Sequence, residues 1–139
     1  MTDNIDVFDA ACAGEWRRGV RDCFTAASDQ LAAWFGVDPM ERYRGRYTTL
    51  TGYLRIIRKD GYRDAQEAFS GEMEAHGFRE TDGPWMDRDV GMIAFPDNGK
   101  PATAPALFFE GGWHIRSRTG WLVLFGDDGL QKVYRCPSR

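Results

Sequence analysis

Apolar residues in the first half of the chain recur every three or four positions, which places them on one face of a helix. The clearest run follows Asp22, and its apolar positions are Phe24, Ala27, Leu31, Trp34 and Phe35. Asp22 can cap the free N–H groups at the start of this helix, and Gly36 can end it in a left-handed conformation. The pattern therefore predicts a helix over about 23–35 that buries one stripe of side chains.

Two further helices are expected before residue 77. The first runs from about Thr49 to Lys59, and its inward positions are Leu50, Tyr53, Leu54, Ile56 and Ile57. The second lies within residues 63–77, where Gly77 ends it and Ser70-Gly71 is expected to interrupt it. Both segments are amphipathic, so each is expected to pack one face against the rest of the domain.

The second half of the chain changes to short runs of Val, Ile, Phe and Trp separated by Gly, Pro, Asp and Asn, which is typical of an antiparallel meander. Strands are expected at about 90–95, 106–110, 113–118, 121–125 and 131–135. The best hairpin turns are Glu110-Gly111-Gly112-Trp113 and Arg118-Thr119-Gly120-Trp121. Helices followed by strands predict an α+β domain with N-terminal helices packed on a C-terminal antiparallel sheet.

Length and composition favour a single domain over residues 1–139. Of these residues 42% are hydrophobic and 14% aromatic, which suffices for one core. Residues 1–20 are interpreted as an N-terminal extension, 21–77 as a helical half and 85–136 as a sheet half.

The net charge of -3 argues against nucleic acid as the main ligand. Neither a signal peptide nor a membrane span is recognised, so the product is expected in the cytoplasm where it is made.

Cys12, Cys23 and Cys136 are expected to be free thiols, because they are odd in number and lack CxxC spacing. Cys23 stands at a predicted helix start, where the helix dipole lowers a thiol pKa and favours a nucleophilic thiolate. Asp22 opposes this effect, because a neighbouring carboxylate disfavours a second negative charge. Cys23 is therefore either a nucleophile or a small apolar residue at a helix start.

A nucleophilic cysteine also needs a base, and the chain has two histidines. His76 ends the third predicted helix, where an imidazolium group interacts with free carbonyl groups, and this capping role is favoured. His114 lies one residue past a turn and is interpreted first as the polar side of a two-faced strand. The alternative is that His114 approaches Cys23 or a ligand, which makes Cys23 and His114 the candidate catalytic pair.

Residues 42–47, "RYRGRY", combine three arginines with two tyrosines around a glycine. Such a cluster can bind phosphates or an acidic protein surface, and its candidate partner-binding residues are Arg42, Arg44, Arg46 and Tyr47. The favoured alternative is that these arginines form ion pairs within the chain, with Asp38, Glu41 and Asp60.

The sheet half suggests neither a metal site nor a cofactor site. Its acidic residues are dispersed in turns without the regular spacing of a calcium loop, at Asp87, Asp89, Asp97, Asp127 and Asp128. Trp85, Trp113 and Trp121 could form a binding surface, but a core role is favoured for them.

A helix that opens with Asp-Cys, further helices, and "DRDVGMIAF" leading into antiparallel strands together resemble the NlpC-type cell-wall cysteine peptidases, which have a papain-like α+β fold. In that superfamily the cysteine is the nucleophile, a Gly-Asp-Val/Leu-like segment enters the first strand, and a histidine opens the second. The resemblance matches Cys23 to the nucleophile and Asp89-Val90 to the strand entry, with Arg88 where glycine is usual. Thr103 or Ala104 stands at the histidine position, which implies that the expected base is missing.

A narrower resemblance covers nearly the full chain. Asp-Pro followed by Arg-Gly-Arg-Tyr, with Asp-Cys upstream, "RDVGMIAF" downstream and a C-terminal "VYRC", resembles a family of small proteins encoded among the tail-tip genes of siphophages and prophages. This resemblance implies a component of the virion tail with a papain-like fold, in contact with other tail-tip or baseplate proteins.

Three functions follow as hypotheses. The favoured one is a structural tail-tip or baseplate protein, a catalytically degenerate peptidase-like domain, because Ala104 replaces the base. The second is an active cysteine amidase or endopeptidase that acts on peptidoglycan during genome entry, with His114 as an unorthodox base for Cys23. Base assistance is worth roughly 10²- to 10⁴-fold, so its loss is costly for this second hypothesis. The third is a phage accessory protein that binds a partner through the basic cluster.

Overall fold

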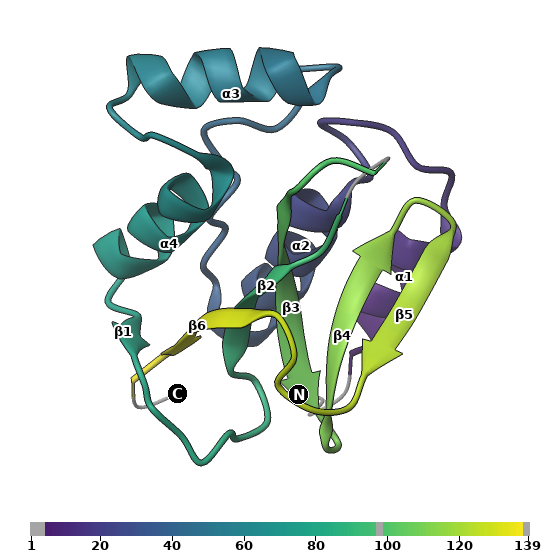
Figure 1. Ribbon diagram of the computed structural model, residues 1–139, viewed down its shortest axis with the longest axis vertical. Coiled ribbons are helices and arrows are strands. Elements are labelled where there is room, and N and C mark those ends of the chain that lie inside the picture. The colour runs from purple at the N-terminus through teal and green to yellow at the C-terminus, as the bar shows by residue number, and fades with distance from the viewer. Residues whose placement is uncertain (1–4, 97–98, 138–139) are drawn as a thin grey trace.

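The computed structural model describes residues 5–96 and 99–137, and in this part of the chain four helices precede six strands (Figure 1). The helices are α1 (Asp6–Ala13), α2 (Cys23–Phe35), α3 (Leu50–Lys59) and α4 (Ala65–Ala75). The strands are β1 (Arg79–Glu80), β2 (Val90–Ala94), β3 (Thr103–Phe109), β4 (Gly112–Ser117), β5 (Gly120–Leu124) and β6 (Leu130–Arg135). The predicted α+β class, with helices first and an antiparallel sheet second, is confirmed.

The strands form one antiparallel sheet in the order β1-β6-β2-β3-β4-β5. β2 to β5 follow one another as the expected meander, with tight turns at Glu110-Gly111 and Arg118-Thr119. The prediction that the meander continues is wrong for β6, which returns across the sheet and lies between β1 and β2 (Figure 1). Gly129 anchors this crossing, because its carbonyl group accepts a hydrogen bond from Ala94 N at 2.8 Å. β5 is thereby left at the edge of the sheet.

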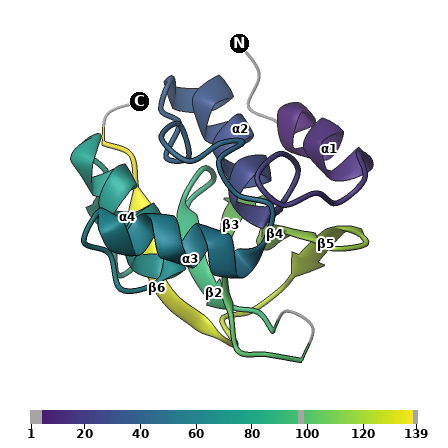
Figure 2. The same ribbon diagram turned by 90° about the horizontal axis from the view of Figure 1, so that it is seen from above.

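Local capping explains where α2 begins and ends. Thr25 N donates to Asp22 Oδ1 and Asp22 N donates to Thr25 Oγ1, both at 2.9 Å, which closes a capping box. Gly36 ends the helix in the left-handed region, with a φ of 70°. The predicted boundaries of this helix are confirmed, and α2 packs on β3 and β4 (Figure 2). The start of α2 is therefore held at a fixed place beside the sheet.

Within residues 1–20 the chain forms α1, a helix where the sequence was interpreted only as an extension. Phe8 and Cys12 are buried one helical turn apart, and α1 packs against α2 and β5. Phe8 N also donates to Gln30 Oε1 at 2.9 Å. Two buried side chains in a short acidic segment give too weak a periodic pattern to indicate a helix, which is why the sequence did not predict α1.

α4 is continuous, so the expected interruption at Ser70-Gly71 is wrong. A Cβ atom on Gly71 would lie 2.6 Å from Tyr62 Cε1, so glycine here makes room for an aromatic ring. The other expected helix ends are confirmed. α3 begins after Thr49, whose side chain caps it, and Gly77 follows α4 with a φ of 94°.

Candidate functional site

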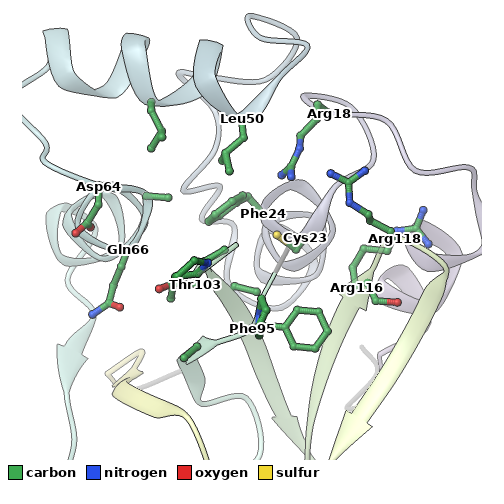
Figure 3. A pocket seen from close by; sticks show the side chains of 18 of the residues that line it. Arg18, Cys23, Phe24, Leu50, Asp64, Gln66, Phe95, Thr103, Arg116 and Arg118 are labelled. Carbon is green, nitrogen blue, oxygen red and sulfur yellow. The ribbon is translucent and has the colours of Figure 1, made fainter. Parts of the chain in front are cut away.

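A cavity of about 620 Å³ opens between the starts of α2 and α4, one face of α3, and the ends of β2, β3 and β4 (Figure 3). Cys23 and Phe24 lie in its wall. Leu50 and Leu54, which were expected in the core, are only partly buried because they face this cavity. Figure 3 shows arginines on one side of Cys23 and, on the other side, Asp64 with Gln66. The cavity is therefore a large concave site beside the candidate nucleophile.

Cys23 is the first residue of α2, and the buried carboxylate of Asp22 holds this position. Asp22 accepts hydrogen bonds from Gly19 N and Thr25 N at 2.9 Å, and a third from the Tyr47 hydroxyl group. Burial, together with the neighbouring Asp22 charge, raises the pKa of Tyr47 well above its ordinary value, so the hydroxyl group stays protonated and donates. Asp22 therefore acts as a fully satisfied helix cap, as the sequence predicted.

Thr103 and Ala104 open β3 and line the same cavity as Cys23 (Figure 3). This is the position at which the NlpC-type resemblance implies a histidine. A methyl group has no proton acceptor, and a neutral hydroxyl group is too weak a base to replace an imidazole near neutral pH. The strand beside α2 therefore supplies no general base at this position.

Neither histidine lines the cavity. His114 is buried in the sheet, where Trp121 Nε1 donates to its Nδ1 and its Nε2 contacts Phe109 O, both at 3.0 Å. Because both ring nitrogens have partners there, the structure does not bring His114 to Cys23. His76 is exposed at the end of α4, and its Nδ1 lies 2.9 Å from Glu72 O, in agreement with a capping role.

Residues 4–95, more than half of the chain, match the family described as "Domain of unknown function (DUF6950)". The chain belongs to the DUF6950 family. The matched region contains α1 to α4, β1 and β2, and so includes Asp22, Cys23 and Tyr47. Comparison with the curated proteins and with the solved structures gave no match. Among the described residues of this DUF6950 protein, no helix has the length and apolar character needed to cross a membrane.

Two of the arginines expected to bind a partner are engaged within the DUF6950 domain. Their acidic neighbours are Asp60 and Glu72, at 2.9 and 3.0 Å from Arg42, and Asp29 and Asp38, at 2.7 and 2.8 Å from Arg44. The intramolecular interpretation is therefore correct for Arg42 and Arg44, although Glu41 is not among these partners. Tyr47 is buried, and its hydroxyl group donates to Asp22. Arg46 is exposed, and so is Arg42 despite its ion pairs, so these two are the exposed members of the proposed partner-binding set.

A group of residues missed by the sequence interpretation forms a cationic wall of the cavity, made of Trp16, Arg18, Arg116 and Arg118. The guanidinium carbons of the three arginines lie 4.9, 5.7 and 5.3 Å, respectively, from the Trp16 ring centroid. Arg116 is only 2% exposed and donates to Cys12 O and Gly14 O at 2.6 Å. Asp64 is the single carboxylate lining the cavity within residues 5–96 and 99–137, so the cationic wall favours an anionic ligand.

Several acidic and tryptophan residues of the sheet half have structural partners. Asp89 is buried against Arg135, and Asp127 accepts from Trp85 Nε1 at 3.0 Å. Asp97 lies outside the described residues. Within the described residues, no group of three histidine, cysteine or carboxylate side chains is placed to hold a metal ion. Trp113 is buried and Trp121 is half exposed, so the predicted core role is correct for the first of these two.

The three thiols are expected to react with iodoacetamide at different rates. Burial raises the pKa of Cys12 to about 12, and Asp9 adds to this effect while Arg116 opposes it. Cys12 should therefore resist labelling at about pH 8, whereas the half-buried Cys136 reacts first. Peptide mass spectrometry of the native protein measures the three rates, and labelling in urea provides the fully reactive reference. Labelling of Cys12 as fast as Cys136 would contradict the burial argument.

Proposed function

We propose that this DUF6950 protein is a structural component of a bacteriophage tail tip or baseplate, built on an NlpC-type, papain-like domain without peptidase catalysis. One observation carries the proposal: Cys23 at the start of α2 shares a cavity with Thr103 and Ala104, while His76 and His114 lie elsewhere. The scaffold of a thiol peptidase is supported by the helix start and the adjoining strand. Catalysis is not supported, because no imidazole meets the thiol.

The cationic wall supports a binding role for the cavity. In a protein without a working nucleophile, a concave site can still receive a group from a neighbouring chain. Arg116 is a buried cation whose guanidinium group donates to two backbone carbonyl groups and lies over the Trp16 ring, with no carboxylate among these contacts. A carboxylate from another tail-tip or baseplate protein would balance this charge. The same feature favours a second candidate function, that of a phage accessory protein that binds an acidic partner outside the particle.

Replacement of Cys23 by alanine is expected to leave phage assembly and infectivity unchanged. The test uses a phage genome carrying this gene, with plaque titre and negative-stain microscopy as the two measurements. Cys12→Ala is the matched control, because it removes another buried thiol from the domain. Peptide mass spectrometry of purified virions separates the two candidate functions, since a structural component remains in the particle and an accessory protein does not.

Normal particles that have lost infectivity only in the Cys23→Ala phage would overturn the non-catalytic role and favour a cysteine amidase. Loss of turbidity in purified cell walls treated with the wild-type protein, but not with Cys23→Ala, would support that same alternative. Absence of the protein from purified virions would overturn the structural role and leave the accessory role.

A further inference from the structure

β5 is an edge strand with an open, apolar border. It pairs with β4 on one side and ends the strand order of the sheet, and both views place it at the outer end with α1 beside it (Figures 1 and 2). Trp121 is 50% exposed and Leu122 36%, and Phe125 directly after the strand is 78% exposed. β5 carries no charge and no proline, the devices that normally keep an edge strand from pairing with another chain.

The register of the β4–β5 hairpin fixes which backbone groups face outward. Because Arg118-Thr119 is a two-residue turn, Ser117 and Gly120 form a hydrogen-bonded pair, and such pairs alternate along the ladder. Leu122 then bonds towards β4. The N–H and C=O groups of Trp121 and Val123 point to the open edge, one residue on each side of Leu122.

We propose that two copies of this chain associate through β5, with the two strands antiparallel about a twofold axis at Leu122. In this register Trp121 of one copy exchanges two backbone hydrogen bonds with Val123 of the second copy, and the reverse pair forms by symmetry. The sheet then continues from one copy into the other. The paired side chains are apolar, so no buried polar side chain is left without a partner at the centre of the junction.

Charges at the two ends of β5 favour a second copy in antiparallel orientation. Arg118 precedes the strand, and Asp127 and Asp128 follow it. With Leu122 on the axis, Arg118 of one copy lies opposite Gly126 of the other and next to Asp127, because 118 and 126 are equally far from 122. A parallel arrangement would instead bring like charges together at both ends. Pairing through β5 does not require the tail-tip role.

The experiment measures the mass of the full chain by light scattering and sedimentation from about 1 to 100 μM. The wild type is expected to approach twice the mass of one chain as the concentration rises. Leu122→Lys places two like charges at the axis and is expected to weaken association at least about tenfold. Met86→Lys is the matched control, because Met86 is another exposed apolar residue, at 55%, in a loop outside β5. This control is expected to associate like the wild type.

Amide hydrogen exchange locates the contact. In the wild type at high concentration, the Trp121 and Val123 amides are expected to be protected from exchange. In Leu122→Lys this protection is expected to be lost, while amides in the core of the domain stay protected. A wild type that is monomeric at the highest concentration overturns the proposal. So does a dimer that persists in Leu122→Lys, or one in which Trp121 and Val123 exchange freely, since either result places the contact elsewhere.

Discussion

Replacing Asp22 by alanine is expected to lower the free energy of unfolding by about 3 kcal/mol. The carboxylate is fully buried and accepts from Gly19 N, Thr25 N and the Tyr47 hydroxyl group. Alanine removes all three acceptor contacts and leaves the donors buried without partners, a larger cost than the loss of an exposed helix cap. Urea unfolding at neutral pH, followed by circular dichroism, measures the change. An m-value that is the same in the wild type and in Asp22→Ala shows that both proteins unfold from the same compact state.

Asp64→Ala is the matched control for Asp22→Ala. Asp64 caps α4 through a single hydrogen bond from Glu67 N at 2.8 Å and is exposed, so its loss should cost about 1 kcal/mol. Asp22→Asn keeps an acceptor for Thr25 N and should fall between the two alanine variants. Equal losses in Asp22→Ala and Asp64→Ala would contradict the view that the buried network fixes the start of α2 beside the cavity.

The elements that the sequence predicted are those with local signals. α2 has a capping residue, an apolar period and a terminating glycine within 15 positions of Asp22, and each hairpin has its turn residues between two apolar runs. The position of β6 has no local signal, because its pairing with β2 depends on which strand edge remains open after β2 to β5 have formed. A linear reading cannot distinguish a strand that continues a meander from one that crosses back.

The candidate site was predictable only in part, because only some of its residues have local signals in the sequence. Cys23 at a helix start follows from the capping pattern, and the NlpC-type resemblance pointed to Thr103 and Ala104 on a neighbouring strand. The cationic wall was missed because Trp16 and Arg116 come from opposite ends of the chain. Arg116 also contradicts the usual expectation that arginines on a strand face solvent, since its guanidinium group donates to the carbonyl groups of Cys12, near the end of α1, and of Gly14 just after it.

Long-range partners also decide the role of the "RYRGRY" cluster. Asp38 is close to Arg44 in sequence and was among the expected partners, but Glu72, which pairs with Arg42, lies 30 residues away on α4. Only the packing of α4 against the segment before α3 brings that carboxylate into reach. A cluster of arginines in a sequence therefore marks a binding surface only when the acidic residues of the folded chain leave some of them exposed, as Arg46 is here.

Replacing Arg135 by methionine is expected to lower the free energy of unfolding by about 3 kcal/mol. Asp89, the strand-entry residue in the NlpC-type resemblance, is 1% exposed and accepts from Arg135 Nε and Nη2, both at 2.8 Å. Methionine preserves much of the packing of the side-chain stem but leaves a buried carboxylate whose remaining hydrogen bond comes from Met86 N at 2.8 Å. Urea unfolding at neutral pH measures the loss.

A double-mutant cycle separates the cost of the unpaired Asp89 charge from the cost of the packing lost with the Arg135 side chain. Adding Asp89→Asn to Arg135→Met removes the unpaired charge while keeping an acceptor for Met86 N, so the double variant should be more stable than Arg135→Met alone by about 1 to 2 kcal/mol. Lys132→Met on the same strand is the matched control, because its contact with Glu80 is 3.9 Å long and half exposed. That control should change stability by less than about 1 kcal/mol. If Arg135→Met is as mild as Lys132→Met, the buried pair does not hold β6 to the entry of β2.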